Sequence, residues 1–316
     1  MSKGLAWAGA ILLLLFGSCT QKRTAANTKI GAEKVYTGQL NIAVDPGLEP
    51  VMKQQQEVFG YQYDSVKLNI QYKNESDMLA DFGSKKVSVL VMCRALDSTE
   101  IKKLIKEDTL YVREIKIAHD AVALIGNKSF NDKDLSIEKL KQYFSPTDTL
   151  ATNPQMVFEG QHSSVVKFIL DKLGYREKIS SHVYSMQSAR EVIEYVKNTK
   201  NAIGFIPYNY VSNQEEEGVR EILDSIKILS LRTKDKDGRQ IRVSANQSDI
   251  ATGDYPLTRN IYTEMRFSYE DSLEWLLVNF LFKDRGEKIF LKDGLIPARM
   301  PARDVEVNTD GIKAAN

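Results

Sequence analysis

Apolar and polar positions alternate in short blocks along residues 40 to 110. Segments 40–44 and 66–72 have the apolar content and alternation of strands, and 88–92 is a continuous apolar run that fits a buried strand. Each is followed by a segment of helical period, and these begin near Leu48, Ser76 and Thr99. This β–α–β–α–β–α order predicts a parallel sheet covered by helices, which is an α/β domain.

The pattern changes after residue 111. Segments 112–118 and 121–126 are both strand-like and meet at His119-Asp120 with no helix between them, which suits a crossover between two lobes. Helix and strand then alternate again as far as residue 206, so the second lobe is predicted to be α/β as well. Further strands are expected over residues 226–231 and 260–267, and terminal helices over residues 269–281 and 285–291.

The N-terminus has a pattern of its own. Lys3 is the only charge before an apolar run over residues 5–16, and Gly17, Ser18 and Cys19 follow. This arrangement predicts an export signal, and it resembles a bacterial lipoprotein signal in which residues 1–18 are removed and Cys19 receives lipid. The alternative is an ordinary signal peptide with an unmodified cysteine. Residues 19–38 have no sustained apolar period and are predicted to be a tether, and several acyl chains on Cys19 would hold the protein on a membrane.

Composition and motifs exclude several functions. Across 316 residues, 43 Lys+Arg against 42 Asp+Glu give a net charge of +1, which argues against a nucleic-acid binder with a strongly basic face. Two cysteines are too few for a disulfide scaffold or a cysteine zinc site, and the three histidines are not at metal-ligand spacing. No phosphate loop, dinucleotide fingerprint, nucleophile elbow or zinc-protease motif occurs, so we expect no enzyme, no cofactor and no metal. A serine hydrolase built on segment 160–164 is the enzymatic alternative.

Three strand ends lead into segments rich in small or polar groups. They are Asp45-Pro46-Gly47, the segment Met92-Cys93-Arg94-Ala95, and Gln161-His162-Ser163-Ser164. Free backbone N–H groups at helix starts, serine hydroxyls and a forked guanidinium all favour an anion. Each feature also has a structural explanation: Gly47 as a turn residue, Arg94 as a surface ion pair and Ser163 as a helix N-cap. Their joint occurrence in two lobes favours an anion site.

These residues belong to a wider resemblance. The segments that carry it run in order from about Leu40 to Pro297: Leu40-Asn41-Ile42-Ala43-Val44-Asp45, Cys93-Arg94-Ala95-Leu96, Ile117-Ala118-His119-Asp120-Ala121-Val122-Ala123, Ser163-Ser164, Ala202-Ile203-Gly204-Phe205, Tyr255-Pro256-Leu257-Thr258-Arg259, Gly286-Glu287-Lys288-Ile289 and Gly294-Leu295-Ile296-Pro297. Together they resemble the phosphate-binding proteins of bacterial ABC importers, in particular lipoprotein members typical of Bacteroidetes-like bacteria. The resemblance implies a two-lobed α/β periplasmic-binding-protein fold of type II-like architecture, with two crossovers and a ligand in the cleft. Lobe one would comprise residues 39–118 plus about 255–316, and lobe two residues 119–254.

The resemblance also implies the ligand contacts. Backbone N–H groups would come from Asp45, Gly47 and Leu48, positive charge from Arg94, and hydroxyl and backbone donors from Ser163 and Ser164. Asp120 would lie near the hinge, with a structural cap as its alternative, and His162 would donate to the ligand. The chain departs from the family at two of these places. The first loop, Asp45-Pro46-Gly47, has no hydroxyl, and Phe158 stands where the family has an arginine before Gly-Ser-Gly-Thr. Both changes weaken the binding of a dianion, although an aspartate can accept the proton of a monohydrogen phosphate.

The sequence therefore predicts an exported, lipid-anchored substrate-binding protein of the cell envelope. We expect a monomer that binds phosphate or a related oxyanion and delivers it to an ABC permease. The alternative is a surface adhesion or assembly protein on the same scaffold, and Phe158 in place of arginine motivates it.

Overall fold

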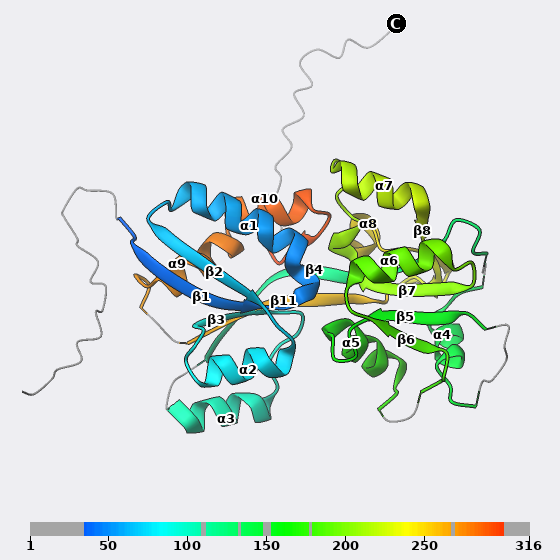
Figure 1. Ribbon diagram of the computed structural model, residues 1–316, viewed down its shortest axis with the longest axis horizontal. Coiled ribbons are helices and arrows are strands. Elements are labelled where there is room, and N and C mark those ends of the chain that lie inside the picture. Colours follow the sequence, from blue (N-terminus) through cyan, green and yellow to red (C-terminus); the bar gives the residue numbers. More distant parts are fainter. Residues whose placement is uncertain are drawn as a thin grey trace, which may run out of the picture.

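The computed structural model in Figure 1 describes residues 35–108, 112–131, 134–147, 153–176, 179–266 and 269–299. The predicted signal peptide, Cys19 and the tether up to residue 34 lie outside the described residues. No helix among the described residues is long and apolar enough to cross a membrane.

One half of the molecule, which we call lobe one, is built on three parallel strands. They are β1 (Gly38–Val44), β2 (Val66–Tyr72) and β3 (Val89–Met92), in the spatial order β2-β1-β3. The connecting helices are α1 (Glu49–Gln62), α2 (Glu75–Gly83) and α3 (Ser98–Asp108), and the short 3-10 turn η1 (Pro46–Leu48) precedes α1. The alternating order predicted for this part of the chain is confirmed.

Two long strands connect the halves. The stretch that the sequence divides at His119-Asp120 is one continuous strand, β4 (Val112–Asn127). Residues 112–121 of β4 pair antiparallel with β11 (Thr258–Arg266), and residues 122–126 pair antiparallel with β7 (Ala202–Pro207). The chain stays extended through His119-Asp120, as the sequence pattern indicates, and polar side chains there do not interrupt the backbone ladder because pairing partners are present on both sides. β4 and β11 thus pass from one lobe toward the other.

The other half, lobe two, repeats the α/β pattern. Its strand order is β4-β7-β5-β6, with β5 (Gln155–Glu159) and β6 (Val183–Met186). Its helices are α4 (Ile137–Tyr143), α5 (Ser164–Leu173), α6 (Ala189–Asn198), α7 (Glu217–Ser225) and α8 (Gln247–Thr252), and η2 (Tyr208–Tyr210) follows β7. The single strand expected over residues 226–231 is instead divided into β8 (Ile226–Ile228), which pairs with β4, and β9 (Leu231–Lys234), which pairs with β10 (Gln240–Val243). The C-terminal helices α9 (Leu273–Phe282) and α10 (Asp284–Lys292) return to lobe one, and β12 (Ile296–Pro297) pairs with β4.

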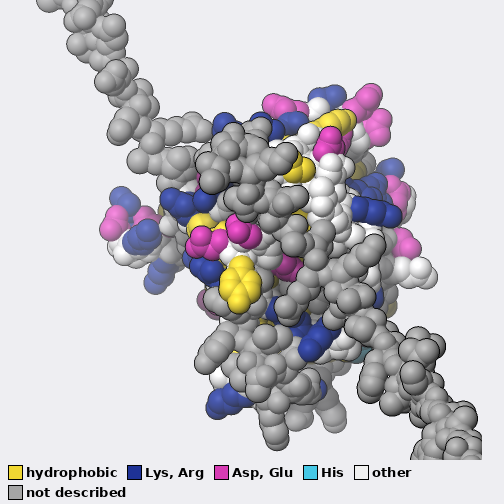
Figure 2. Space-filling view, turned by 90° about the vertical axis from the view of Figure 1, so that its left-hand side faces the viewer, with side chains coloured by type: hydrophobic (Ala, Val, Ile, Leu, Met, Phe, Trp, Pro, Cys, Tyr) yellow, Lys and Arg dark blue, Asp and Glu magenta, His cyan; other side chains and the backbone are white. Residues whose placement is uncertain are grey.

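Each lobe has an apolar core. In lobe two, Phe158 and Phe205 stack with ring centroids 4.4 Å apart, and Phe144 contacts both rings edge-on. In lobe one, Phe59 and Phe280 pack edge-to-face 5.3 Å apart between α1 and α9. The surface carries charges of both signs: Figure 2 shows basic and acidic side chains mixed over the end of lobe one, as the near-zero net charge leads one to expect. Any attraction for an anion therefore has to be local.

Candidate functional site

A buried arginine lies where the two connecting strands leave lobe one. Arg259 of β11 is 4% exposed, and the antiparallel register places it opposite Asp120 of β4, which is 0% exposed. Nε of Arg259 donates to Oδ2 of Asp120 at 2.9 Å, and Nη1 donates to Oγ of Ser164, at the start of α5 in lobe two, at 2.8 Å. The guanidinium therefore joins the hinge strands to lobe two.

Acidic neighbours keep this guanidinium charged. Burial is the largest influence on the pKa of Arg259 and lowers it, but the acids around the group, Asp120 and Asp45 among them, more than offset this and hold the pKa above its usual value. Burial raises the pKa of Asp120, although Arg259 works in the opposite direction. We conclude that the positive charge of Arg259 is the fixed feature around which the other groups are arranged.

The turn that follows β1 packs against the same guanidinium. A Cβ atom on Gly47 would lie 2.8 Å from Cγ of Pro207 and 3.4 Å from Nη2 of Arg259, so only glycine permits this approach. Asp45 is 3% exposed, and its Oδ1 accepts the N–H of Gly47 at 2.8 Å. Across the seam between the lobes, Asn209 donates to the carbonyl of Gly47 at 2.8 Å.

The prediction that this turn offers free backbone donors is wrong in the arrangement observed. The N–H of Asp45 donates to the carbonyl of Val91, the N–H of Gly47 donates to the Asp45 side chain, and the N–H of Leu48 donates to the carbonyl of Asp45. An aspartate at the start of a tight turn satisfies the turn's own donors, and this competes with a ligand. What the turn contributes to the seam is the Asp45 carboxylate.

The start of α5 divides its polar residues between two roles. Ser163 is the N-cap, and its hydroxyl accepts the N–H of Val166 at 3.2 Å, as the structural explanation expected. Ser164 is 8% exposed and contacts Arg259. His162 is exposed in the preceding loop. Of the predicted lobe-two donors, the structure brings only Ser164 to the guanidinium.

Arg259, Asp120, Asp45 and Ser164 form a group that we call the Arg259 cluster. Arg94 lies away from this cluster. Its Nε donates to Glu75 at 2.9 Å, and Nη1 and Nη2 donate to the two carboxylate oxygens of Glu100 at 2.8 Å. Glu75 also forms an ion pair with Lys167 of lobe two at 3.1 Å. The placement of Arg94 in a ligand cleft is corrected accordingly: two carboxylates from α2 and α3 occupy its donors, and the hydrogen bond to Glu100 is the largest cause that raises its pKa.

Two further buried groups face the cluster. Glu159, at the end of β5, is 7% exposed, and burial, together with the charge of Asp45, raises its pKa to about 8. Cys93, at the end of β3, is 6% exposed, and burial raises the pKa of its thiol well above the usual value. At neutral pH both groups are therefore protonated. Glu159 has an O–H to donate, which a carboxylate at its ordinary pKa would lack.

Sequence reasoning missed Arg259 and Glu159 as site residues, although one signal was present. Residues 258–261 alternate between half-buried and buried positions, and Arg259 falls on the buried face together with Ile261. A charged residue in the inward register of a strand is uncommon unless it has a partner, and this marks Arg259 as a candidate. The predicted position of the family arginine, Phe158, is 1% exposed and belongs to the lobe-two core.

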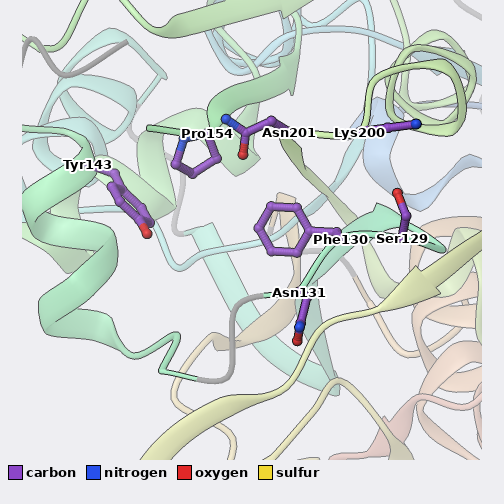
Figure 3. A pocket seen from close by; sticks show the side chains of 7 residues that line it. All are labelled: Ser129, Phe130, Asn131, Tyr143, Pro154, Lys200 and Asn201. Atoms are coloured by element: carbon purple, nitrogen blue, oxygen red, sulfur yellow. The ribbon is translucent and has the colours of Figure 1, made fainter. Parts of the chain in front are cut away.

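A wide surface hollow lies elsewhere. At the far end of lobe two, residues Ser129, Phe130, Asn131, Tyr143, Pro154, Lys200 and Asn201 line a hollow of about 510 Å³ (Figure 3). It shares no residue with the cluster around Arg259, and Lys200 is its only lining residue with a charged side chain. The described residues also contain no group of three or more histidine, cysteine or acidic side chains that could hold a metal ion.

Comparison with known structures identifies the fold. A phosphate ABC transporter substrate-binding protein from Clostridium perfringens, solved with bound phosphate, is similar at 20% identity and a TM-score of 0.66, over 83% of this chain and 100% of that one. An ABC-type phosphate transport receptor from Vibrio cholerae is similar at 15% identity and a TM-score of 0.62, over 81% and 99%. The sulfate-bound regulatory domain of an OxyR2 mutant from Vibrio vulnificus is similar at 11% identity and a TM-score of 0.51, over 79% and 97%. At these identities the likeness shows the fold.

The family follows from the sequence match. No curated protein matches the chain significantly. A family model described as a PBP superfamily domain, however, matches residues 28–270, which is well over half of the 316 residues. The two-lobed α/β architecture predicted from the sequence is that of periplasmic binding proteins. The chain thus belongs to the PBP superfamily, a family of binding proteins rather than enzymes.

Proposed function

We propose that this protein binds a small oxyanion, with phosphate as the first candidate, in the seam between its lobes and presents it to an ABC importer. The observation that carries the proposal is the buried guanidinium of Arg259, which joins the hinge strands to Ser164 of lobe two. The similarity in fold to phosphate-binding receptors supports the same function. The alternative role in adhesion or assembly was based on Phe158 standing where the family has an arginine. Arg259 of β11 supplies a guanidinium from a different strand, so this reason for the alternative no longer applies.

Arg259 has hydrogen-bonding capacity available for an anion. Its Nη2 lies 2.8 Å from Oδ2 of Asp120 as an ion pair, yet this buried nitrogen makes no hydrogen bond. Its Nη1 donates to the neutral hydroxyl of Ser164, a weaker acceptor than a charged oxygen. An oxyanion that reaches the group can therefore replace Ser164 as the acceptor, and the serine hydroxyl then becomes a donor to the anion.

The surrounding acids select the form of the anion. The Asp45 carboxylate repels a fully deprotonated anion but can accept a hydrogen bond from an oxyanion that carries a proton, as phosphate does at neutral pH. The protonated carboxyl of Glu159 can donate to the same ligand. We therefore propose Arg259, Ser164, Asp45 and Glu159 as the ligand-binding residues, with Asp120 as the residue that positions Arg259 and His162 as a contact at the rim.

Anion affinity should fall as pH rises through about 8, because Glu159 ionises there and replaces an O–H donor with a negative charge. Phosphate affinity is measured by calorimetry from pH 6.5 to pH 9. Over this range the fold-decrease in affinity of the wild-type protein should be about ten times or more that of Glu159→Gln. Phosphate itself also ionises over this range, but it does so equally for both proteins, so the comparison with Glu159→Gln isolates the contribution of Glu159. The control is Glu194→Gln, in an exposed residue of α6. Parallel profiles for the wild-type protein and Glu159→Gln would remove Glu159 from the site.

We also propose that the protein is located in the cell envelope and that its partner is an ABC permease. The β4–β11 connection supplies a hinge, and a ligand held by both lobes favours the closed arrangement that a permease can distinguish. Lipid on Cys19 would hold the protein at the membrane. Fractionation of cells tests this point: Cys19→Ser should move the protein from the membrane to the soluble fraction, and a soluble wild-type protein would contradict the anchor.

A further inference from the structure

A second pocket lies on the seam, outside the Arg259 cluster. It has a volume of about 120 Å³ and is lined by residues of both lobes. Lobe one contributes Gln54 of α1 and Asp293, which follows α10, and lobe two contributes the segment from Asn209 to Ile222, after β7. Figure 1 shows α1, α10 and α7 along the same side of the sheet. Whatever occupies this pocket contacts both lobes.

Two residues that line the pocket each have a buried acceptor atom with no hydrogen-bond partner. Oδ1 of Asn209 and Oδ2 of Asp293 are unpartnered, and these residues are 4% and 2% exposed. The amide orientation of Asn209 is fixed, because its Nδ2 donates to the carbonyl of Gly47 at 2.8 Å. The other oxygen of Asp293 accepts from Gln54 at 2.8 Å and from Asn213 at 3.1 Å. An unmatched buried acceptor is unfavourable, and a ligand with N–H donors would remove that cost.

The charge at the pocket favours a cation. Glu216 lies beside Asp293, and both carboxylates accept hydrogen bonds from the amides of Gln54 and Asn213. Within the described part of the chain, no basic side chain forms an ion pair with either carboxylate. Arg190 lines the pocket from its exposed rim. Glu216 is exposed and Asp293 is buried, so the Asp293 carboxylate, held by neutral amides, is the buried negative charge that a ligand can neutralise.

The pocket also has apolar lining. Pro50, Val219, Ile222 and the ring of Tyr210 are among its lining residues, and Val219 is 7% exposed. A bare metal ion would use the acceptors alone and leave the apolar side chains without a contact, whereas an organic cation uses both kinds of lining. A volume of about 120 Å³ has room for about four groups the size of a water molecule. Size, charge and polarity together describe a short alkylamine.

We propose that this seam pocket binds a small primary organic ammonium, whose N–H groups donate to Asn209 Oδ1 and Asp293 Oδ2 and whose carbon chain packs against Val219 and Ile222. Because both lobes line the pocket, the bound amine stabilises the closed arrangement. It therefore increases affinity for an oxyanion at the Arg259 cluster, and the oxyanion increases affinity for the amine by the same factor. This coupling rests on the proposed function, whereas amine binding does not.

Calorimetric titration of the purified full chain with ethylammonium tests the site, in the absence of phosphate and at pH 7.5. Tetramethylammonium has the charge but no N–H donor, and ethanol has a donor but no charge. Ethylammonium should bind at least ten times more tightly than either. Equal affinity for ethylammonium and tetramethylammonium, or no saturable heat with ethylammonium, would overturn the proposal.

Variants locate the binding. Asp293→Asn should weaken ethylammonium binding at least tenfold, and Glu215→Gln, an exposed neighbour that does not line the pocket, should leave it unchanged. Burial is the main cause that raises the pKa of Asp293, to about 6; Glu216 adds to the effect and Lys292 opposes it. Amine affinity should therefore fall as pH drops below about 6. Unaltered binding by Asp293→Asn, or a flat profile from pH 7.5 to pH 5, would contradict the assignment.

A second titration, with phosphate present, separates the two proposals. Coupled sites predict tighter ethylammonium binding in phosphate than in chloride. Ethylammonium binding without any phosphate binding would refute the proposed function and leave the amine site intact. Phosphate binding without ethylammonium binding would refute the amine site alone.

Discussion

Replacing Arg259 with methionine is expected to lower phosphate affinity by about 100-fold or more, because the change removes the buried charge that both lobes share. The variant also leaves Asp120 buried without its partner, which costs about 3–5 kcal/mol of folding stability. Arg259→Lys separates the effect on binding from the effect on stability, since lysine keeps the positive charge but lacks the several planar N–H donors of the guanidinium. We expect Arg259→Lys to fold and to bind phosphate about tenfold more weakly, as measured by calorimetry and circular dichroism.

Arg94→Ala is the matched control for this prediction. Like Arg259, Arg94 has short contacts to carboxylates, but it is only partly buried, its partners are Glu75 and Glu100, and it does not reach the cluster. Its loss should leave phosphate affinity within twofold of the wild-type value. If Arg94→Ala abolished phosphate binding while folded Arg259→Lys bound phosphate as well as the wild-type protein does, the phosphate site would lie at Arg94, after the end of β3, and not at Arg259.

Replacing Phe158 with arginine is expected to prevent folding rather than restore the arginine usual in the family. The ring of Phe158 is 1% exposed, stacks on Phe205 at 4.4 Å and meets Phe144 edge-on. An arginine there would bury an unpaired charge and remove the aromatic packing, and loss of the ring alone costs about 3–5 kcal/mol. Expression in the soluble fraction and urea unfolding measure the effect.

Phe158→Leu is the conservative comparison. Leucine keeps an apolar side chain at this position, so the variant should remain folded, at a cost of about 1–2 kcal/mol. A soluble, folded Phe158→Arg protein that binds phosphate more tightly than the wild-type protein would show that position 158 faces the ligand. It would also contradict the assignment of Phe158 to the core.

The fold could be predicted from the sequence to the extent that it depends on local pattern. Strands β1, β2 and β3 were found because their apolar runs are short and are separated by helical segments of ordinary length. The sequence indicates that the chain stays extended through His119, but not which strands pair with it, because β11 and β12 lie more than 130 positions later in the chain. The local pattern of apolar and polar residues does not identify pairing strands that are distant in sequence.

The candidate site shows the same limit. Arg259 and Asp120 are 139 positions apart, and only the register of β11 on β4 places them opposite each other. Arg94 was a reasonable candidate because it follows a buried strand, yet Glu75 and Glu100 reach it from two neighbouring helices. Ser164 was found because a serine at the start of a helix is visible in sequence. Short-range features of the site were therefore predictable, and the central charge was not.

The binding of phosphate by the wild-type protein is the central claim, and calorimetric titration at pH 7 tests it most directly. We predict saturable heat with a stoichiometry of one phosphate per chain, weaker or absent heat with sulfate, and phosphate binding that is about tenfold weaker in Arg259→Lys than in Arg94→Ala. No heat with phosphate or any other small oxyanion, at several protein concentrations, would contradict it.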